Sequence, residues 1–179
     1  SWAGSSSPVD WLLDQQYRRE HPYTGAAPGG WAWTDLPGGV PDSDDTSGAL
    51  LALSRLAPED PRALDAATRG VQWLLGLQNR DGGLPTFCRG WGALDFDRSC
   101  ADITAHALRA WHALSPRLDS QWRDRLAPAP ERALRFLERS QPADGSCSPL
   151  WFGAQSASDE INLVSVTSRP LLPLAHPSP

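Results

Sequence analysis

The residues best suited to chemistry form one short acidic segment. Three carboxylates fall within four consecutive residues, Asp42-Ser43-Asp44-Asp45, after a glycine- and tryptophan-rich approach at residues 29–33. Carboxylates this close repel one another, and burial beside tryptophan would raise the pKa of at least one of them. A carboxylic acid that stays neutral near pH 7 can donate a proton. The alternative interpretation is a helix N-terminus, where Asp and Ser side chains cap free N–H groups and suit the helix dipole.

Internal repetition indicates the elements that must position this segment. Each of three units holds an aromatic–leucine pair, a glutamine, a glycine turn and a second helical pattern. The aromatic residues and glutamines are Trp11 and Gln16, Trp73 and Gln78, and Phe136 and Gln141. Each unit is therefore expected to be an outer helix, a turn and an inner helix. The predicted fold class is all-α, built from helix hairpins that bury their faces only by stacking.

Helical periodicity and capping residues give the expected boundaries. Outer helices are predicted over residues 7–18, 60–78 and 130–140, inner helices over 44–56 and 100–114, and a short helix over 116–126. A third inner helix within 158–169 is damaged, because Pro170 stops it and more prolines follow. We predict one domain over residues 1–169 with a Pro-rich tail over 170–179.

Composition excludes several classes of function. A chain of 179 residues is long enough for one domain with a core, and its net charge of −5 argues against a nucleic-acid partner. We expect no signal peptide and find no hydrophobic run long enough to span a membrane. Three cysteines without a CxxC pair indicate a reducing compartment and no zinc site. The arginine-rich segment 117–139 is interpreted as a solvated outer face, and His21 and His112 as surface residues.

Four segments together match a known set of motifs. Residues 69–82 and 132–145 each hold an arginine, an aromatic–leucine pair, a glutamine and a glycine at repeated spacing. Residues 42–46 read DxDD-T, and residues 102–106 read D-x-T-A-H. In this order they resemble the QW repeats, the acid motif and the histidine segment of squalene–hopene and oxidosqualene cyclases, which are class II terpene cyclases. The resemblance covers nearly the whole chain up to about residue 169.

The resemblance implies an α/α-toroid, here incomplete, whose rings of inner and outer helices enclose an aromatic-lined cavity. It implies an isomerase of the intramolecular transferase type, which cyclises a linear polyene such as squalene through carbocations, with no cofactor and no metal. It also implies a cytoplasmic protein that attaches peripherally to a membrane, from which the apolar isoprenoid substrate enters.

The resemblance also assigns roles by position. Asp44 would be the proton donor, Asp42 and Asp45 would modulate its acidity, and His106 would hydrogen-bond the acid. Supporting roles fall on Cys88, which would order water near the acid, and on Asp102. The aromatic residues expected to contact the substrate are Trp31 and Trp33. An alkene is a very weak base, so the donor must hold its proton until reaction, and aromatic faces would then stabilise each cation by about 1–2 kcal/mol.

Departures from the pattern leave alternatives open. Leu84 and Cys147 stand where the repeats end in tryptophan, and Ser165 and Val166 replace a tyrosine and a glycine. Three helix pairs cannot close a toroid, so the chain would be a truncated cyclase that needs a missing portion or further copies of itself. One alternative is a non-catalytic helical-repeat module that binds an isoprenoid or a partner protein. Another is a protein like the prenyltransferase β-subunit, which would need a zinc site.

Overall fold

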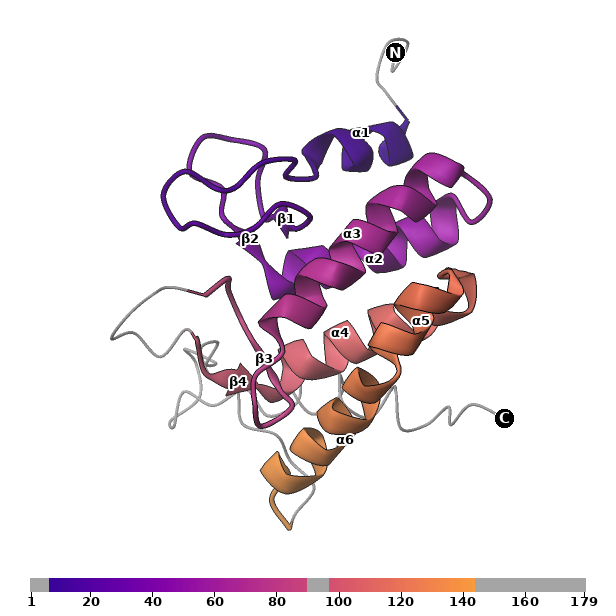
Figure 1. Ribbon diagram of the computed structural model, residues 1–179. Helices are drawn as coiled ribbons and strands as arrows, with labels where there is room; N and C mark the ends of the chain where they lie inside the picture. Colours follow the sequence, from indigo (N-terminus) through magenta and orange to yellow (C-terminus); the bar gives the residue numbers. More distant parts are fainter. Residues whose placement is uncertain (1–6, 90–96, 144–179) are drawn as a thin grey trace.

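Helical hairpins and two short strand pairs make up the fold in a computed structural model of the chain (Figure 1). The structure describes residues 7–89 and 97–143. The helices there are α1 (Pro8–Gln15), α2 (Ser43–Leu56), α3 (Pro61–Leu77), α4 (Ala101–Leu114), the 3-10 turn η2 (Ser115–Arg117), α5 (Ser120–Leu126) and α6 (Pro128–Ser140). The all-α prediction is confirmed. The predicted third inner helix and the tail over 170–179 lie outside the described residues.

The helices pack as the repeat pattern predicts. Helix α2 packs against α3 and α4, and α4 packs in turn against α6. Figure 1 shows α1, α3 and α6 following one another from the top of the view to the bottom, with α2 behind α3. Leu50, Leu74 and Trp111, from α2, α3 and α4, are fully buried in the core between these helices. Hydrophobic burial between neighbouring hairpins therefore holds the arrangement together.

Two pairs of short strands connect α1 to α2 and α3 to α4. Strand β1 (Trp31–Ala32) pairs antiparallel with β2 (Pro41–Asp42), and β3 (Leu84–Pro85) pairs with β4 (Ser99–Cys100). An antiparallel bridge between Asp42 and Phe87 joins the two turn regions. These pairings fix where α2 and α4 begin.

A glutamine clamp fastens α1 to α3. The predicted helix over residues 7–18 ends early because Gln16 adopts an extended backbone. Its side-chain amide donates to the carbonyl oxygens of Gly29 and Ala66, each at 2.9 Å. Its amide oxygen accepts from the guanidinium of Arg69. One buried side chain thus joins an outer helix, its glycine turn and the next outer helix.

A second clamp repeats these contacts between α3 and α6. The amide of Gln78 donates to the carbonyl oxygens of Gly82, at 2.8 Å, and Ala129, at 2.9 Å. Its amide oxygen accepts from Arg132. The repeat in the sequence is therefore also a repeat of hydrogen bonds, and the clamp residues have a structural role: they join successive outer helices.

Glycine is required in both turns. Gly29 and Gly82 have φ angles of +122° and +97°, which side-chain-bearing residues rarely adopt. A Cβ atom would lie 2.8 Å from the carbonyl oxygen of Arg69 at the first position and 2.2 Å from that of Arg132 at the second. The turns can approach the next outer helix this closely only because they carry no side chain there.

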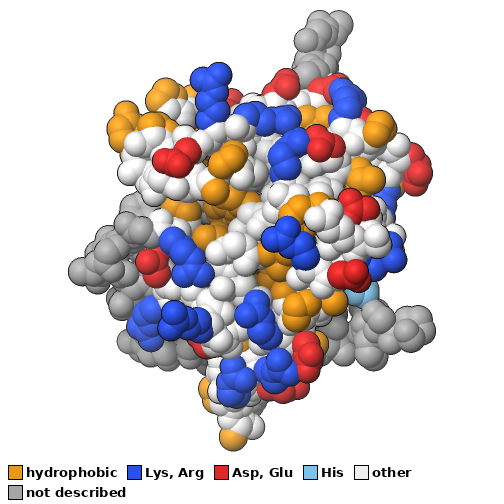
Figure 2. Space-filling model, in the orientation of Figure 1, with side chains coloured by type: hydrophobic (Ala, Val, Ile, Leu, Met, Phe, Trp, Pro, Cys, Tyr) orange, Lys and Arg blue, Asp and Glu red, His pale blue; other side chains and the backbone are white. Residues whose placement is uncertain are grey.

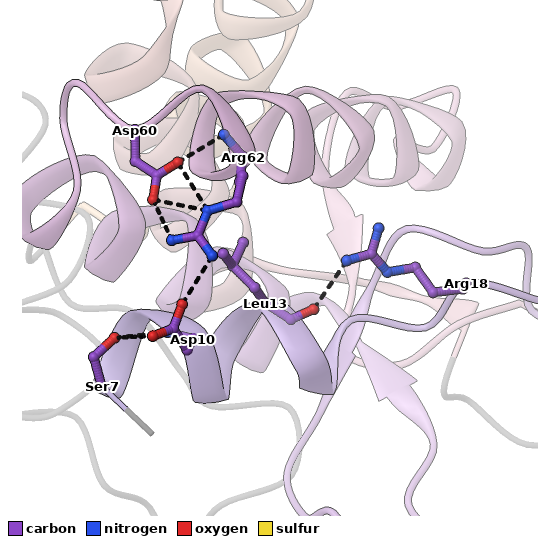
Figure 3. A network of polar contacts seen from close by, with 6 residues as sticks. All are labelled: Ser7, Asp10, Leu13, Arg18, Asp60 and Arg62. Atoms are coloured by element: carbon purple, nitrogen blue, oxygen red, sulfur yellow. Dashed lines mark hydrogen bonds and ion pairs between the residues drawn. The ribbon is translucent and has the colours of Figure 1, made fainter. Parts of the chain in front are cut away.

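Surface ion pairs add to the contact between α1 and α3. The guanidinium of Arg62 bridges Asp10, at 3.0 Å, and Asp60, at 2.8 Å (Figure 3). Hydrogen bonds from Ser7 and Arg62 hold the pKa of Asp10 below its usual range. Such exposed pairs contribute little to stability compared with the buried clamps.

The outer face carries mixed charge. Figure 2 shows arginine side chains interspersed with acidic ones over the face that α3, α5 and α6 present. Within residues 117–139, the side chains of Arg123, Arg125, Glu131 and Arg135 are exposed. The prediction of a solvated outer face is confirmed for these side chains, whereas Arg117 and Arg132 of the same segment are half-buried.

Replacement of Gln78 by alanine tests the clamp. The variant would leave two buried carbonyl oxygens without this donor and Arg132 without this acceptor, at a cost of about 1–3 kcal/mol for each buried group left unsatisfied. We expect the free energy of unfolding, measured by urea denaturation and circular dichroism, to fall by at least about 2 kcal/mol. The matched control is Gln121→Ala at an exposed position of α5, expected within about 0.5 kcal/mol of wild type. Equal stabilities of the two variants would contradict the clamp.

Candidate active site

The candidate site begins with Asp42 at the first turn of α2. Asp42 is the N-cap, and its Oδ1 accepts the backbone N–H of Asp45 at 2.8 Å. The pairing of β1 with β2 places Asp42 opposite Trp31, and its bridge to Phe87 covers it further, so only 3% of the residue is exposed. The helix-cap interpretation of the acidic segment and the buried-acid interpretation thus both apply to this residue.

Burial determines the charge of Asp42. Desolvation, first, and then a hydrogen bond with the Asp45 side chain and the charges of Asp45 and Asp44 together raise the pKa of its carboxyl to about 9. The backbone N–H of Asp45 acts in the opposite direction. Near pH 7 the Asp42 side chain is therefore a neutral carboxylic acid.

Asp44 lies two residues after Asp42, in the first turn of α2, and its side chain pairs with a residue of the next inner helix, α4. Its Oδ1 is 2.6 Å from Nδ1 of His106, which projects from α4. The exposed fractions of the two side chains are 38% for Asp44 and 16% for His106. Gly48, one turn after Asp44, lies beside the imidazole, since a Cβ there would be 3.8 Å from Cε1 of His106. The structure therefore brings together the acid and the histidine that the sequence places far apart.

The two tryptophans of the approach segment differ in exposure. Trp31 is 2% exposed, and its indole N–H donates to the carbonyl oxygen of Leu12 at 2.7 Å, so its ring packs in the core. Trp33 is 53% exposed and meets Phe87 edge to face, with 6.4 Å between ring centroids. Of the pair, Trp33 presents the accessible aromatic face, and contact of either ring with a substrate remains a prediction.

The predicted supporting residues are buried. Cys88 is 1% exposed, and it follows Phe87 in the segment that bridges to Asp42. Asp102 is 7% exposed and accepts a hydrogen bond from the thiol of Cys100 at 2.7 Å. Asp102 is the second residue of α4, as Asp44 is the second residue of α2, so the two aspartates occupy equivalent positions of the repeat.

Two threonines that the sequence analysis placed in the motifs, without a role, hold the site in place. The hydroxyl of Thr46 accepts the backbone N–H of Trp31, and that of Thr104 accepts the backbone N–H of Leu84, both at 2.9 Å. Thr46 comes two residues after Asp44, and Thr104 comes two residues after Asp102. This repeated spacing was the sequence signal that could have indicated a shared role for the two threonines. The threonines fasten the turns to the inner helices.

The prediction that His21 lies on the surface is wrong, whereas His112 is exposed as predicted. His21 is 4% exposed, because backbone groups of its own loop enclose it. Its Nε2 lies 2.9 Å from the carbonyl oxygen of Gly39, and the backbone N–H of Thr24 donates to its Nδ1 at 3.2 Å. Helical periodicity gives no information about such a loop residue.

Two cavities lie elsewhere in the described part of the chain. One, of about 680 Å³, is lined by residues that include Asn79, Arg80 and Arg98, and the other, of about 250 Å³, by residues that include Trp11 and Asp35. Within residues 7–89 and 97–143, no cluster of three His, Cys, Asp or Glu side chains is placed to hold a metal ion. None of the helices described there has both the length and the apolar character needed to cross a bilayer.

Fold and site together define a helical-repeat protein with an acid–histidine pair between adjacent inner helices. A family model of the squalene–hopene cyclase C-terminal domain matches residues 4–158. The chain belongs to this family, and the resemblance inferred from its motifs is confirmed.

Individual relatives agree with this assignment. Squalene–hopene cyclase of Alicyclobacillus acidocaldarius is 31% identical in an alignment 176 residues long, and the match covers 80% of this chain and 24% of the relative. Sporulenol synthase of Bacillus subtilis is 30% identical over 162 residues, covering 81% and 23%, respectively. Enfumafungin synthase of Hormonema carpetanum is 31% identical over 177 residues, covering 81% and 12%. The chain thus spans about a quarter or less of the length of these relatives.

The pKa of Asp42 predicts a pH dependence of stability. A carboxyl has a pKa of about 4 in the unfolded chain, so between about pH 4 and pH 9 the folded protein holds one proton more than the unfolded chain. The free energy of unfolding should therefore fall as pH rises through this window, by up to about 1.4 kcal/mol per pH unit from this group. Asp42→Asn keeps the cap and removes the titration.

Urea denaturation at a series of pH values measures this dependence. We expect the Asp42→Asn variant to lose less stability than wild type as pH rises, and to gain on wild type most at alkaline pH. Asp35→Asn, at an exposed loop position, should follow the wild-type curve. Parallel curves for wild type and Asp42→Asn would show that Asp42 titrates normally.

Proposed function

We propose that this chain forms part of a class II terpene cyclase and that Asp44 starts cyclisation by protonating an alkene of a linear polyene such as squalene. The observation that carries the proposal is the contact of 2.6 Å between Asp44 and His106 across α2 and α4. Membership of the squalene–hopene cyclase family supports the same reaction class. The enclosed cavity, the substrate and any peripheral contact with a membrane would be properties of the whole protein.

The proposed step is a single proton transfer. The π electrons of the alkene take the proton from one oxygen of Asp44, which leaves a carbocation on the polyene and a carboxylate on Asp44. His106 would donate through Nδ1 to Oδ1 and stabilise that carboxylate as it forms. Asp42 is neutral near pH 7, so it adds no negative charge beside the donor.

Aromatic side chains support the later carbocation steps. Trp33 and Phe87 contact each other edge to face, one from the approach segment and one from the segment bridged to Asp42. Aromatic faces attract cations through the ring quadrupole and exclude the water that would quench them. The ring of Trp33 is the more exposed of the two approach-segment tryptophans and is proposed to contact the substrate.

Asp44→Asn in the whole protein tests the proposal. Loss of a positioned general acid costs about 10²- to 10⁴-fold in rate, so cyclic product measured by gas chromatography with squalene as substrate should fall by at least about 100-fold. The control Asp35→Asn makes the same chemical change at an exposed position and should retain activity. Equal activity of the two variants would refute the role of Asp44. A wild-type protein that binds squalene without converting it would favour a non-catalytic binding module.

A further inference from the structure

One backbone carbonyl near the acid motif accepts two side-chain hydrogen bonds. The oxygen of Gly39 lies 2.7 Å from the hydroxyl of Tyr17 and 2.9 Å from Nε2 of His21. Both donors come from the loop after α1, and the rings of Tyr17 and His21 pack together with 5.5 Å between centroids. Neither residue belongs to the motifs of the repeat or of the acid.

The hydrogen bonds around both donors suit this role. The backbone N–H of Thr24 donates to Nδ1 of His21, so that nitrogen carries a lone pair and Nε2 is the nitrogen that donates to Gly39. Burial raises the pKa of Tyr17, so its hydroxyl keeps its proton. The backbone of His21 is itself fixed, since its N–H donates to Ala26 and its carbonyl accepts from Gly25.

Gly39 lies where the chain enters the site. A Cβ there would lie 2.7 Å from the carbonyl oxygen of Thr34, and the N–H of Gly39 donates to Leu36, so the turn before it is tight. Val40 and Pro41 follow as buried residues, and Asp42 comes next. A displacement of Gly39 would therefore be carried directly into strand β2 and the cap of α2.

We propose that Tyr17 and His21 are positioning residues for the acid motif: together they anchor the carbonyl of Gly39, which keeps strand β2 paired with β1, so that Asp42 stays buried, and sets the start of the helix that carries Asp44. The catalytic part of this inference rests on the proposed function. The structural part, the pairing of β2 with β1 that buries Asp42, stands independently of it.

The physical consequence of losing the anchor is hydration. Without one of the two donors, the carbonyl of Gly39 would be incompletely paired, and β2 would open to let water satisfy it. Burial is the main reason that the carboxyl of Asp42 stays neutral, so water entry would move its pKa toward the ordinary value. The first turn of α2 would lose its fixed orientation, and Asp44 would meet the alkene less often in a productive geometry.

Tyr17→Phe tests the anchor with a matched control. The variant keeps the ring and removes only the hydroxyl that donates to Gly39. Tyr23→Phe makes the same change at a residue that is 87% exposed. With carbon-13-labelled aspartate, the carboxyl chemical shift of Asp42 can be followed by NMR against pH in the full chain. We expect the pKa of Asp42 to fall by about one unit or more in Tyr17→Phe and to stay unchanged in Tyr23→Phe.

A second pair of variants removes the other donor. His21→Ala should lower the pKa of Asp42, and His21→Gln, whose side-chain amide can reach Gly39, should restore it in part. In the cyclisation assay, Tyr17→Phe and His21→Ala should lower kcat by about tenfold or more with little change in KM, because binding of the polyene does not involve them.

The two readouts separate the possible failures. A wild-type protein without cyclase activity would refute the proposed function, while the titration of Asp42 would still decide whether the anchor exists. Folded Tyr17→Phe and His21→Ala proteins in which Asp42 titrates as in wild type would refute the anchor. A lowered pKa of Asp42 with unchanged kcat would confine Tyr17 and His21 to a structural role and refute them as positioning residues for catalysis.

Discussion

The glutamine clamps are the constraint on which the rest of the structure depends. A single helix hairpin cannot bury its inner face, so the relative placement of successive hairpins decides what becomes core and what becomes site. Gln16 and Gln78 fix that placement, because each amide binds a turn carbonyl and a carbonyl of the next outer helix at the same time. The residues that receive these bonds include Gly29 and Gly82, where any side chain would collide with the next helix. Each glutamine can therefore join two outer helices only where the turn between them carries a glycine.

This frame sets the inner helices side by side and so creates the acid–histidine pair. The turns that the clamps hold are themselves bound to the inner helices by Thr46 and Thr104. As a result α2 and α4 pack against each other, and Asp44 on one helix meets His106 on the other. The pair arises from packing between helices far apart in sequence, and no local interaction within either helix produces it. Chemistry at this site is thus tied to the stability of the outer layer.

The sequence could predict most of the fold but only part of the site. Helical periodicity and the repeat located the helices well, yet α1 ends earlier than expected because Gln16 uses its backbone and side chain for the clamp. Spacing indicated that some carboxyl would be neutral, whereas identifying Asp42 required its bridge to Phe87, a contact between distant segments. His21 was misplaced for a related reason: loop backbone groups bury it, and neither period nor motif encodes such contacts. Helical periodicity and sequence motifs do not predict which polar groups distant in sequence pair with one another.

The acid motif shows how one residue type can take two roles in adjacent positions. Asp42 and Asp44 are both aspartates of the first turn of α2 or its cap, where the helix dipole favours negative charge. Strand pairing nevertheless excludes water from Asp42, and desolvation outweighs the hydrogen bond that the backbone N–H of Asp45 donates. The side chain of Asp44 contacts His106 on the neighbouring helix α4 and remains partly exposed to solvent. A neutral Asp42 relieves the repulsion that three ionised carboxylates would create in one helical turn. The motif can therefore concentrate acidic groups without unfolding the helix that carries them, provided that β2 stays paired with β1.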